Sequence, residues 1–340
     1  MKIVKSLLLI SLISIFSFSA KAVTLNAIME NVPDTLFIQE LLPDFKAKTG
    51  IDVEFEIMGY GEMHPKMIPS LTASTGSIDF MPVDFYWVGE FALAGWMIPL
   101  DDYIEKDSFD TSVYFDSMME LVGKVEGTTY MLPFYNYAMG LTYRKDLVAD
   151  ATHQAGFKSK YGMDLKEPTS WDEYMNQVSY FTGNGTKYGV VNQGSKADPV
   201  AMEWSNYLYA NGGRFHDENW HGELTSDAAK NALADYIHNL NNHGPTGAAA
   251  FGFDEAFNVA AQGQAYSYIT YNWFMPSYED ASQSGVVGKM ALAPVPNNGS
   301  LNGAWGWAIP TSSPNADAAW EFIKWVESPE IVAKRALMGG

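Results

Sequence analysis

The amino-terminal third of the chain alternates short apolar segments with amphipathic ones, and this alternation restricts the possible folds more than any other feature. Residues 23–29, 51–57 and 77–83 have the length and composition of β-strands, and residues 35–48, 62–73 and 87–94 have helical spacing. Gly50 and Gly95 follow helices, as glycine commonly does. Strand–helix alternation with short connections predicts an α/β fold with a doubly wound, parallel sheet and right-handed crossovers.

A second lobe is expected after this first one, with the chain passing between them more than once. Residues 133–143 are apolar and aromatic without helical period, which is typical of an extended crossing segment. Residues 265–271 form a strand that is expected to carry the chain back. We therefore expect a hinge between a first lobe of residues 23–132 and 272–312 and a second lobe of residues 133–271 and 313–340.

Export is indicated by residues 1–22, in which Lys2 and Lys5 precede an apolar run that ends in Ala20-Lys21-Ala22. This pattern predicts a cleaved signal peptide. The chain contains no cysteine, which excludes disulfides and a lipid-modified cysteine and favours the periplasm without a lipid anchor. The net charge of -19 argues against nucleic acid and anionic membranes as partners, and we expect a monomer.

A turn that follows the strand 77–83 is the first candidate for a ligand site. Asp84, Tyr86 and Trp87 come directly after this strand, and α/β sheets bind ligands at the carboxyl ends of their strands. A carboxylate beside flat aromatic faces suits a polar, ring-shaped ligand. The structural alternative is an aspartate that caps the next helix, with both aromatics in the core.

Further candidates share a position at a strand end, in a glycine-flanked turn or in the crossing segment. Aromatic faces stack on the C–H patches of sugars, and carboxylates and amides bind their hydroxyls. The candidates are Trp273 with Asn272, Trp305 with Trp307, Tyr60 between Gly59 and Gly61, Glu30 with Asn31, and Asn136 with Tyr137.

Motifs for catalysis, cofactors and metals give little support to an enzyme. The sequence has no H-E-x-x-H pair, nucleophile elbow, phosphate-binding loop or dinucleotide fingerprint, so no cofactor is expected. His216 and His221 are five residues apart in a loop and only weakly suggest a metal site. Carboxylates are abundant enough that a glycosidase pair stays possible, although no pair stands out.

Several stretches resemble family 1 of the extracellular solute-binding proteins, which feed sugar ABC transporters. They are LLPDFKAKTGIDVEF, SIDFMPVDFYWVGEFALAGWMIPLDDYI, LTYRKDL with EPTSWDEY, YLYANGGRF and GAWGWAIPTSSPNADAAWEFIKWVESPE, in the family's order. The resemblance implies a hinge-closing receptor that captures a carbohydrate or polyol between two lobes and delivers it to transmembrane permease subunits. It also implies a longer second lobe, so the chain resembles a fragment shortened at its carboxyl end.

Two other functions stay open from the sequence. A cage of Trp and Tyr with Asp84 could also hold a cation such as betaine or a polyamine. A secreted carbohydrate-active enzyme is the other alternative.

Overall fold

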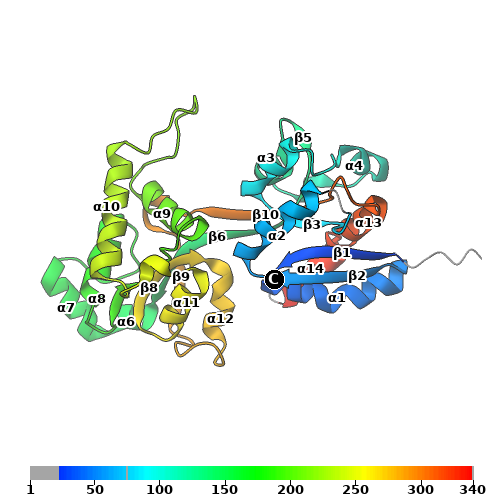
Figure 1. Cartoon of the computed structure of the whole chain (residues 1–340). Coiled ribbons are helices and arrows are strands. Elements are labelled where there is room, and N and C mark those ends of the chain that lie inside the picture. The colour runs from blue at the N-terminus through cyan, green and yellow to red at the C-terminus, as the bar shows by residue number, and fades with distance from the viewer. Residues whose placement is uncertain (1–22, 74–75, 339–340) are drawn as a thin grey trace, which may run out of the picture.

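The computed structural model describes residues 23–73 and 76–338, and it consists of two lobes joined by long strands (Figure 1). The expected signal peptide, residues 1–22, lies outside the described residues. Among the described residues, no helix is long and apolar enough to cross a membrane. The two-lobed α/β architecture agrees with the expectation from the sequence.

The first lobe contains the beginning and the end of the described chain. Two apolar clusters form its core, one around Phe45, Phe80 and Trp320 and the other around Met67, Val83 and Phe91. Its elements are β1 (Thr24–Glu30), α1 (Pro33–Thr49), β2 (Asp52–Met58), α2 (Tyr60–Thr72), β3 (Met81–Asp84), α3 (Phe85–Leu93), α4 (Asp101–Asp107), α5 (Asp116–Met118), β4 (Lys124–Val125), β5 (Thr128–Thr129), α13 (Ala316–Val326) and α14 (Pro329–Met338).

The second lobe is formed by the middle of the chain. Its core includes Tyr174, Tyr207 and Tyr266 in one cluster and Phe257 and Tyr278 in another. Its elements are α6 (Lys145–Ala149), α7 (Ala151–Tyr161), α8 (Trp171–Phe181), β7 (Tyr188–Val190), α9 (Asp198–Ala210), α10 (Asp227–Asn242), α11 (Phe253–Ala261), β8 (Ala265–Tyr271), η4 (Asn272–Phe274), α12 (Met275–Glu279) and β9 (Met290–Ala293).

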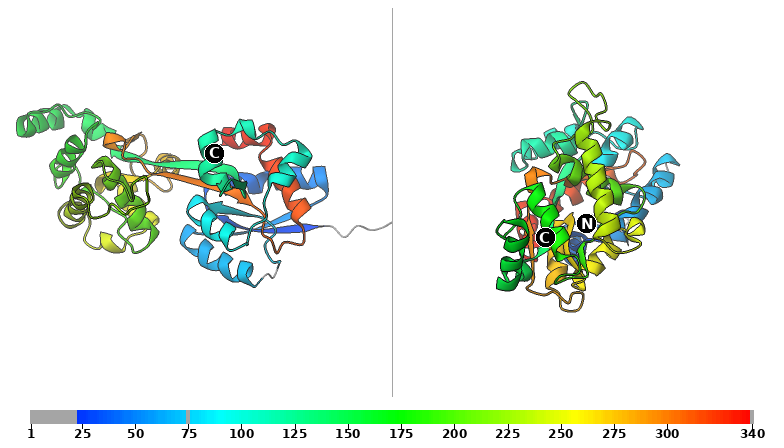
Figure 2. Two further views of the ribbon diagram at one scale, coloured as in Figure 1. Left: turned by 90° about the horizontal axis from the view of Figure 1, so that it is seen from above. Right: turned by 90° about the vertical axis from the view of Figure 1, so that its left-hand side faces the viewer.

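Two strands run from one lobe to the other, β6 (Leu132–Arg144) and β10 (Asn302–Ala308), and Figure 2 shows both from above. They are antiparallel to each other. In the first lobe β10 also pairs with β3, and in the second lobe β6 pairs with β8 and β9. The expected crossing at residues 133–143 is therefore β6, but the chain returns through β10 and not through residues 265–271.

The strand pairing is mixed rather than all parallel. β1 and β2 are parallel, a parallel bridge links Ala27 to Phe80 at β3, and β7 is parallel to β8. β6 runs from the first lobe to the second and β10 runs back. Each is antiparallel to the strands with which it pairs. The carboxyl ends of β1 and β3 consequently face the second lobe.

The lobe boundaries differ from the expected ones in two segments. Residues 272–301 lie in the second lobe, because β9 pairs with β6 and Phe274 packs on Phe257. Residues 313–338 lie in the first lobe, because Phe322 of α13 stacks on Phe80 at a centroid distance of 4.3 Å and α14 contacts α1. Local patterns identify an element but do not say against which core it packs.

Capping residues and the spacing of apolar residues determine where several helices and strands begin and end. Ser170 and Glu173 form a capping box at the start of α8. Helices α11 and α13 and strand β8 have the bounds that their spacing predicts. On α13, Ala319, Trp320, Ile323 and Val326 are all buried, as the face predicted from helical periodicity requires.

Candidate functional site

A cleft of about 940 Å³ lies between the two lobes and receives residues from both. The first lobe contributes the ends of β1 and β3 and the start of α2, and the crossing strands contribute Tyr137, Gly303 and Trp305. The second lobe contributes the start of α9, the start of α11 and the end of β8. Of the residues expected to bind a ligand, those that line the cleft are Glu30, Asn31, Tyr60, Asp84, Trp87, Tyr137, Trp273 and Trp305.

The first-lobe wall of the cleft is aromatic. The indoles of Trp87 and Trp305 meet edge to face at a centroid distance of 5.4 Å, and the ring of Tyr60 stacks on Trp87 at 5.5 Å. Trp87 and Trp305 are only 7% and 5% exposed because Tyr60 covers part of both. Trp273 and Phe253 line the opposite side. Flat rings on both sides suit a ligand with C–H faces.

Two carboxyl groups, that of the partly buried Glu30 and that of the buried Asp84, lie at the strand ends of the first lobe. Burial raises the pKa of Glu30 to about 7, although the hydroxyl of Tyr135 donates a hydrogen bond of 2.6 Å to its Oε2. Burial likewise raises the pKa of Asp84 to about 7, against the hydrogen bond from the backbone N–H of Tyr86. Near neutral pH each group can therefore donate as well as accept a hydrogen bond, which suits hydroxyl ligands.

Two tyrosines of β6 attach this crossing strand to the first lobe. Tyr135 and Tyr137 are two residues apart, so their rings lie on one face, 4.7 Å between centroids. Tyr135 donates to Glu30 at the end of β1, and Tyr137 donates to Asp34 in the first turn of α1. The base of the cleft is thus held in place by phenol–carboxylate hydrogen bonds.

Trp307 and Asn136, both expected to bind ligand, lie outside the cleft. Trp307 is fully buried, its ring stacks on Phe134 at 4.0 Å, and its Nε1 donates to Glu327 at 2.8 Å. Asn136 lies between Tyr135 and Tyr137 on the strand and lines a separate apolar groove. Alternation along β6 turns its side chain away from the face that carries the two tyrosines.

Tyr86 and Asn272 also lie outside the cleft lining. The ring of Tyr86 is 47% exposed and packs on Phe85 at 4.1 Å, so it lies beside the cleft lining, within electrostatic range of Asp198 and Tyr209 of the second lobe. The Oδ1 of Asn272 accepts the backbone N–H of Ala138 at 3.2 Å. This side chain therefore connects the end of β8 to the crossing strand instead of facing a ligand.

Several cleft residues were missed from the sequence, and most belong to the second lobe. They are His64, Lys196, Asp198, Phe253, Asp254, Glu255 and Tyr271. Tyr271 could have been found, because it is the last residue of β8 and precedes Asn272 and Trp273. Asp198 begins α9, and nothing in the local sequence indicates that this helix start faces the first lobe.

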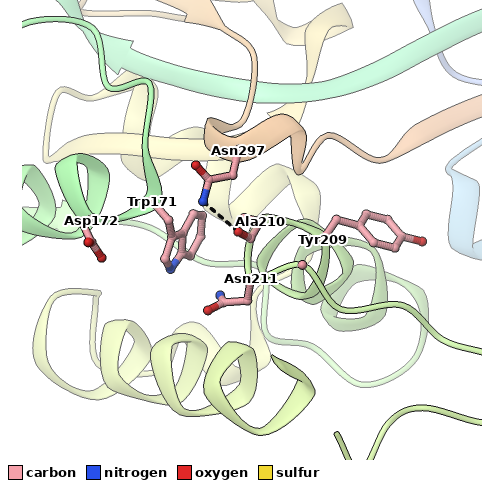
Figure 3. Close-up of a pocket in the computed structure, with 7 residues that line it drawn as sticks. Trp171, Asp172, Tyr209, Ala210, Asn211 and Asn297 are labelled. Atoms are coloured by element: carbon pink, nitrogen blue, oxygen red, sulfur yellow. Dashed lines mark hydrogen bonds between the residues drawn. The ribbon is translucent and has the colours of Figure 1, made fainter. Parts of the chain in front are cut away.

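A smaller pocket of about 480 Å³ lies on the second lobe, away from the cleft (Figure 3). The close-up shows Trp171 and Asn297 together, with the ring of Tyr209 directed away from them. Asn297 Nδ2 donates to the carbonyl of Ala210 at 3.0 Å, and Trp171 Nε1 donates to Asp235 at 2.7 Å. These polar groups already have protein partners, which makes them poor candidates for ligand binding.

Metal binding finds no support among residues 23–73 and 76–338, where no cluster of three or more His, Asp and Glu side chains could hold an ion. In the loop with His216 and His221, each imidazole Nδ1 instead contacts an oxygen of Asp217.

Comparison with known proteins decides the family. The model of the bacterial extracellular solute-binding proteins matches residues 30–333, which is most of the chain. The chain belongs to this family. Its members are receptors for solutes and not catalysts, so the secreted-enzyme alternative is set aside.

Individual relatives of this solute-binding protein bind polyols. It is 26% identical over 322 residues to the mannitol-binding protein of Pseudomonas aeruginosa, covering 90% of this chain and 69% of that protein. A solute-binding protein of Agrobacterium radiobacter K84 in complex with ribitol is 28% identical, with a TM-score of 0.81 over 93% of this chain and 79% of the other. A solute-binding protein of Agrobacterium vitis S4 with bound D-mannitol is 25% identical, with a TM-score of 0.77 over 94% and 76%.

Proposed function

We propose that this protein is the periplasmic receptor of an ABC importer, which captures a neutral polyol or sugar between its lobes and delivers it to the membrane permease. The observation that carries the proposal is the cleft itself, in which indole faces lie beside the carboxyl groups of Glu30 and Asp84, both with raised pKa. The polyol-binding relatives support the same class of ligand.

The charges of the cleft argue against an anionic solute. Among the described residues that line it, the acidic ones are Glu30, Asp84, Asp198, Asp254 and Glu255, whereas Lys196 is the one lysine and no arginine is present. Phosphate and carboxylate groups are usually bound by arginine or lysine clusters. Sugar phosphates and sugar acids should therefore bind weakly.

Titration of tryptophan fluorescence with ribitol, D-mannitol, tagatose and maltose tests the proposal directly, because Trp87, Trp273 and Trp305 line the cleft. We expect a saturable change with at least one polyol or sugar, and a higher melting temperature in its presence. Gluconate and mannitol 1-phosphate serve as anionic counterparts. Saturation with the anions but with none of the neutral compounds would overturn the proposal.

A cationic solute such as betaine or a polyamine is a second candidate, favoured by the same carboxylates beside aromatic rings. The two candidates differ in proton linkage. A cation would bind best when Glu30 and Asp84 are ionised, so its affinity should rise as pH increases through about 7 and fall with added salt. The affinity for a neutral polyol should not fall with salt.

A further inference from the structure

Tyr60 is a side chain of the first lobe that contacts the second lobe directly. It begins α2, and its ring packs on Trp87 and Trp305 of its own lobe. Its hydroxyl donates a hydrogen bond of 3.0 Å to Oδ2 of Asp198, the first residue of α9. Its ring also meets Phe253 of the second lobe edge to face at 6.5 Å. Polar and apolar contacts across the cleft therefore converge on one residue.

The same hydroxyl lies within hydrogen-bonding reach of Asp84, so it stands between one carboxyl group from each lobe. A phenol has one proton and can donate it to only one acceptor at a time. Asp84 is 3% exposed, and a buried carboxylate without a partner is costly. Because the proton of Tyr60 goes to Asp198, a hydroxyl of a bound polyol could donate to Asp84 in its place.

The backbone conformation of Ala197, just before Asp198, gives independent support for the contact between Asp198 and Tyr60. Ala197 has φ 84° and ψ −137°, a region that is strained for any residue with a Cβ. Such strain persists only where surrounding contacts enforce it. Here it sets the start of α9 so that the Asp198 carboxylate faces Tyr60.

We propose that Tyr60 and Asp198 form a latch that holds the two lobes together in the absence of solute, and that a ligand hydroxyl replaces the phenol beside Asp84. The second half of this statement rests on the proposed function. The first half concerns the unliganded protein only and is testable without any ligand.

Interlobe distance in the unliganded full chain tests the latch. The chain has no native cysteine, so dyes can be attached specifically to introduced ones. L93C on α3 and L233C on α10 each carry one dye at an exposed position, one in each lobe. In this background we compare Y60F and D198A, alone and together, by energy transfer and small-angle scattering. Y103F is the matched control, since the hydroxyl of Tyr103 donates to Asp317 at the same distance of 3.0 Å, but within the first lobe.

We expect Y60F and D198A each to lower the ratio of closed to open molecules about tenfold, the value of one hydrogen bond to a charged group. The double variant should open no further than either single variant, because both remove the same contact. Y103F should leave the distance unchanged. A distance in Y60F and D198A equal to that of the parent would overturn the proposal.

A ligand titration separates the latch from the proposed function. If no compound of the polyol and sugar panel binds the parent protein, the proposed function fails, and the unliganded distances still decide the latch. If ribitol binds the parent, Y60F should still close when ribitol is added, since the ligand then bridges the lobes. A Y60F protein that stays open with saturating ribitol would contradict the replacement of the phenol by the ligand.

Discussion

Trp305 and Trp307 lie two residues apart on β10, yet one lines the interlobe cleft and the other is sealed in the core of the first lobe. Trp305 pairs with Asp84, the last residue of β3, whereas Trp307 pairs with Pro82 and so lies about 7 Å deeper along the strand. This difference in depth leaves Trp305 available to a ligand, whereas Trp307 stabilises the core of the lobe.

Replacing each of these tryptophans with alanine should therefore separate binding from stability. Trp307→Ala should lower the free energy of unfolding by about 3–5 kcal/mol, because it empties a core position and removes the donor to Glu327. Trp305→Ala opens space that water in the cleft can fill, so it should cost less stability and weaken polyol binding about tenfold. Urea unfolding and fluorescence titration measure the two effects. Similar binding loss in two equally stable variants would contradict this assignment.

Asp84→Asn should weaken ligand binding while the fold stays intact. The Asp84 carboxyl caps α3 by accepting the backbone N–H of Tyr86 at 3.1 Å, and asparagine caps helices equally well. The amide removes one of the oxygen acceptors that face the cleft. Asp110→Asn is the matched control, because Asp110 caps a short helix in the same way on the exposed surface. Calorimetric titration with ribitol that gives equal affinities for both variants would return Asp84 to a purely structural role.

Ala197→Gly should stabilise the protein. Glycine adopts the φ and ψ of Ala197 without strain, which relieves about 1–3 kcal/mol. It also loses more backbone freedom on folding, about 0.5–1 kcal/mol, so a net gain of about 1 kcal/mol is expected. Ala201→Gly, in the interior of the same helix, should instead cost about 1 kcal/mol. Urea unfolding should therefore shift the midpoints of these two variants in opposite directions.

Stability should depend on pH through Glu203, which is fully buried in the second lobe. Burial raises its pKa to about 8, although Gln193 N–H and Asn192 Nδ2 donate to it. Because its pKa is higher in the folded than in the unfolded chain, its contribution is complete below about pH 4.5 and disappears as pH rises through about 8.

Glu203→Gln should remove this proton linkage, which is at most about 1.4 kcal/mol per pH unit for one group. Urea unfolding between pH 5 and pH 8 measures the slope. Glu218→Gln, an exposed carboxylate of the same lobe, should leave the slope unchanged. An unaltered slope in the Glu203 variant would show that this carboxyl does not retain its proton in the folded protein.

Local patterns in the sequence predicted the elements better than their placement. The bounds of α11 and α13 and the capping box of α8 follow from spacing and cap residues, which act within a few residues of the chain. The lobe to which α13 belongs depends on the contact between Phe322 and Phe80, which lie far apart in the sequence. No periodicity contains that information.

The candidate site divides in the same way. Strand ends identified Glu30, Asp84 and Trp273, because backbone topology alone brings such residues to a cleft. Asp198 was missed because its role depends on a contact with Tyr60 that forms only when the two lobes meet. Trp307 was placed in the site because a strand pattern does not reveal how deep a residue lies below the edge of its sheet.

The order of elements along the chain also determines the order in which the lobes can be completed during synthesis. The core of the second lobe draws on residues 139–301, so the ribosome releases every part of it as one continuous stretch. The core of the first lobe needs Trp320, Phe322 and Ile331 beside Leu25 and Phe45. The lobe that is synthesised first is therefore the last to be able to fold, and it stays incomplete until Ile331 has emerged.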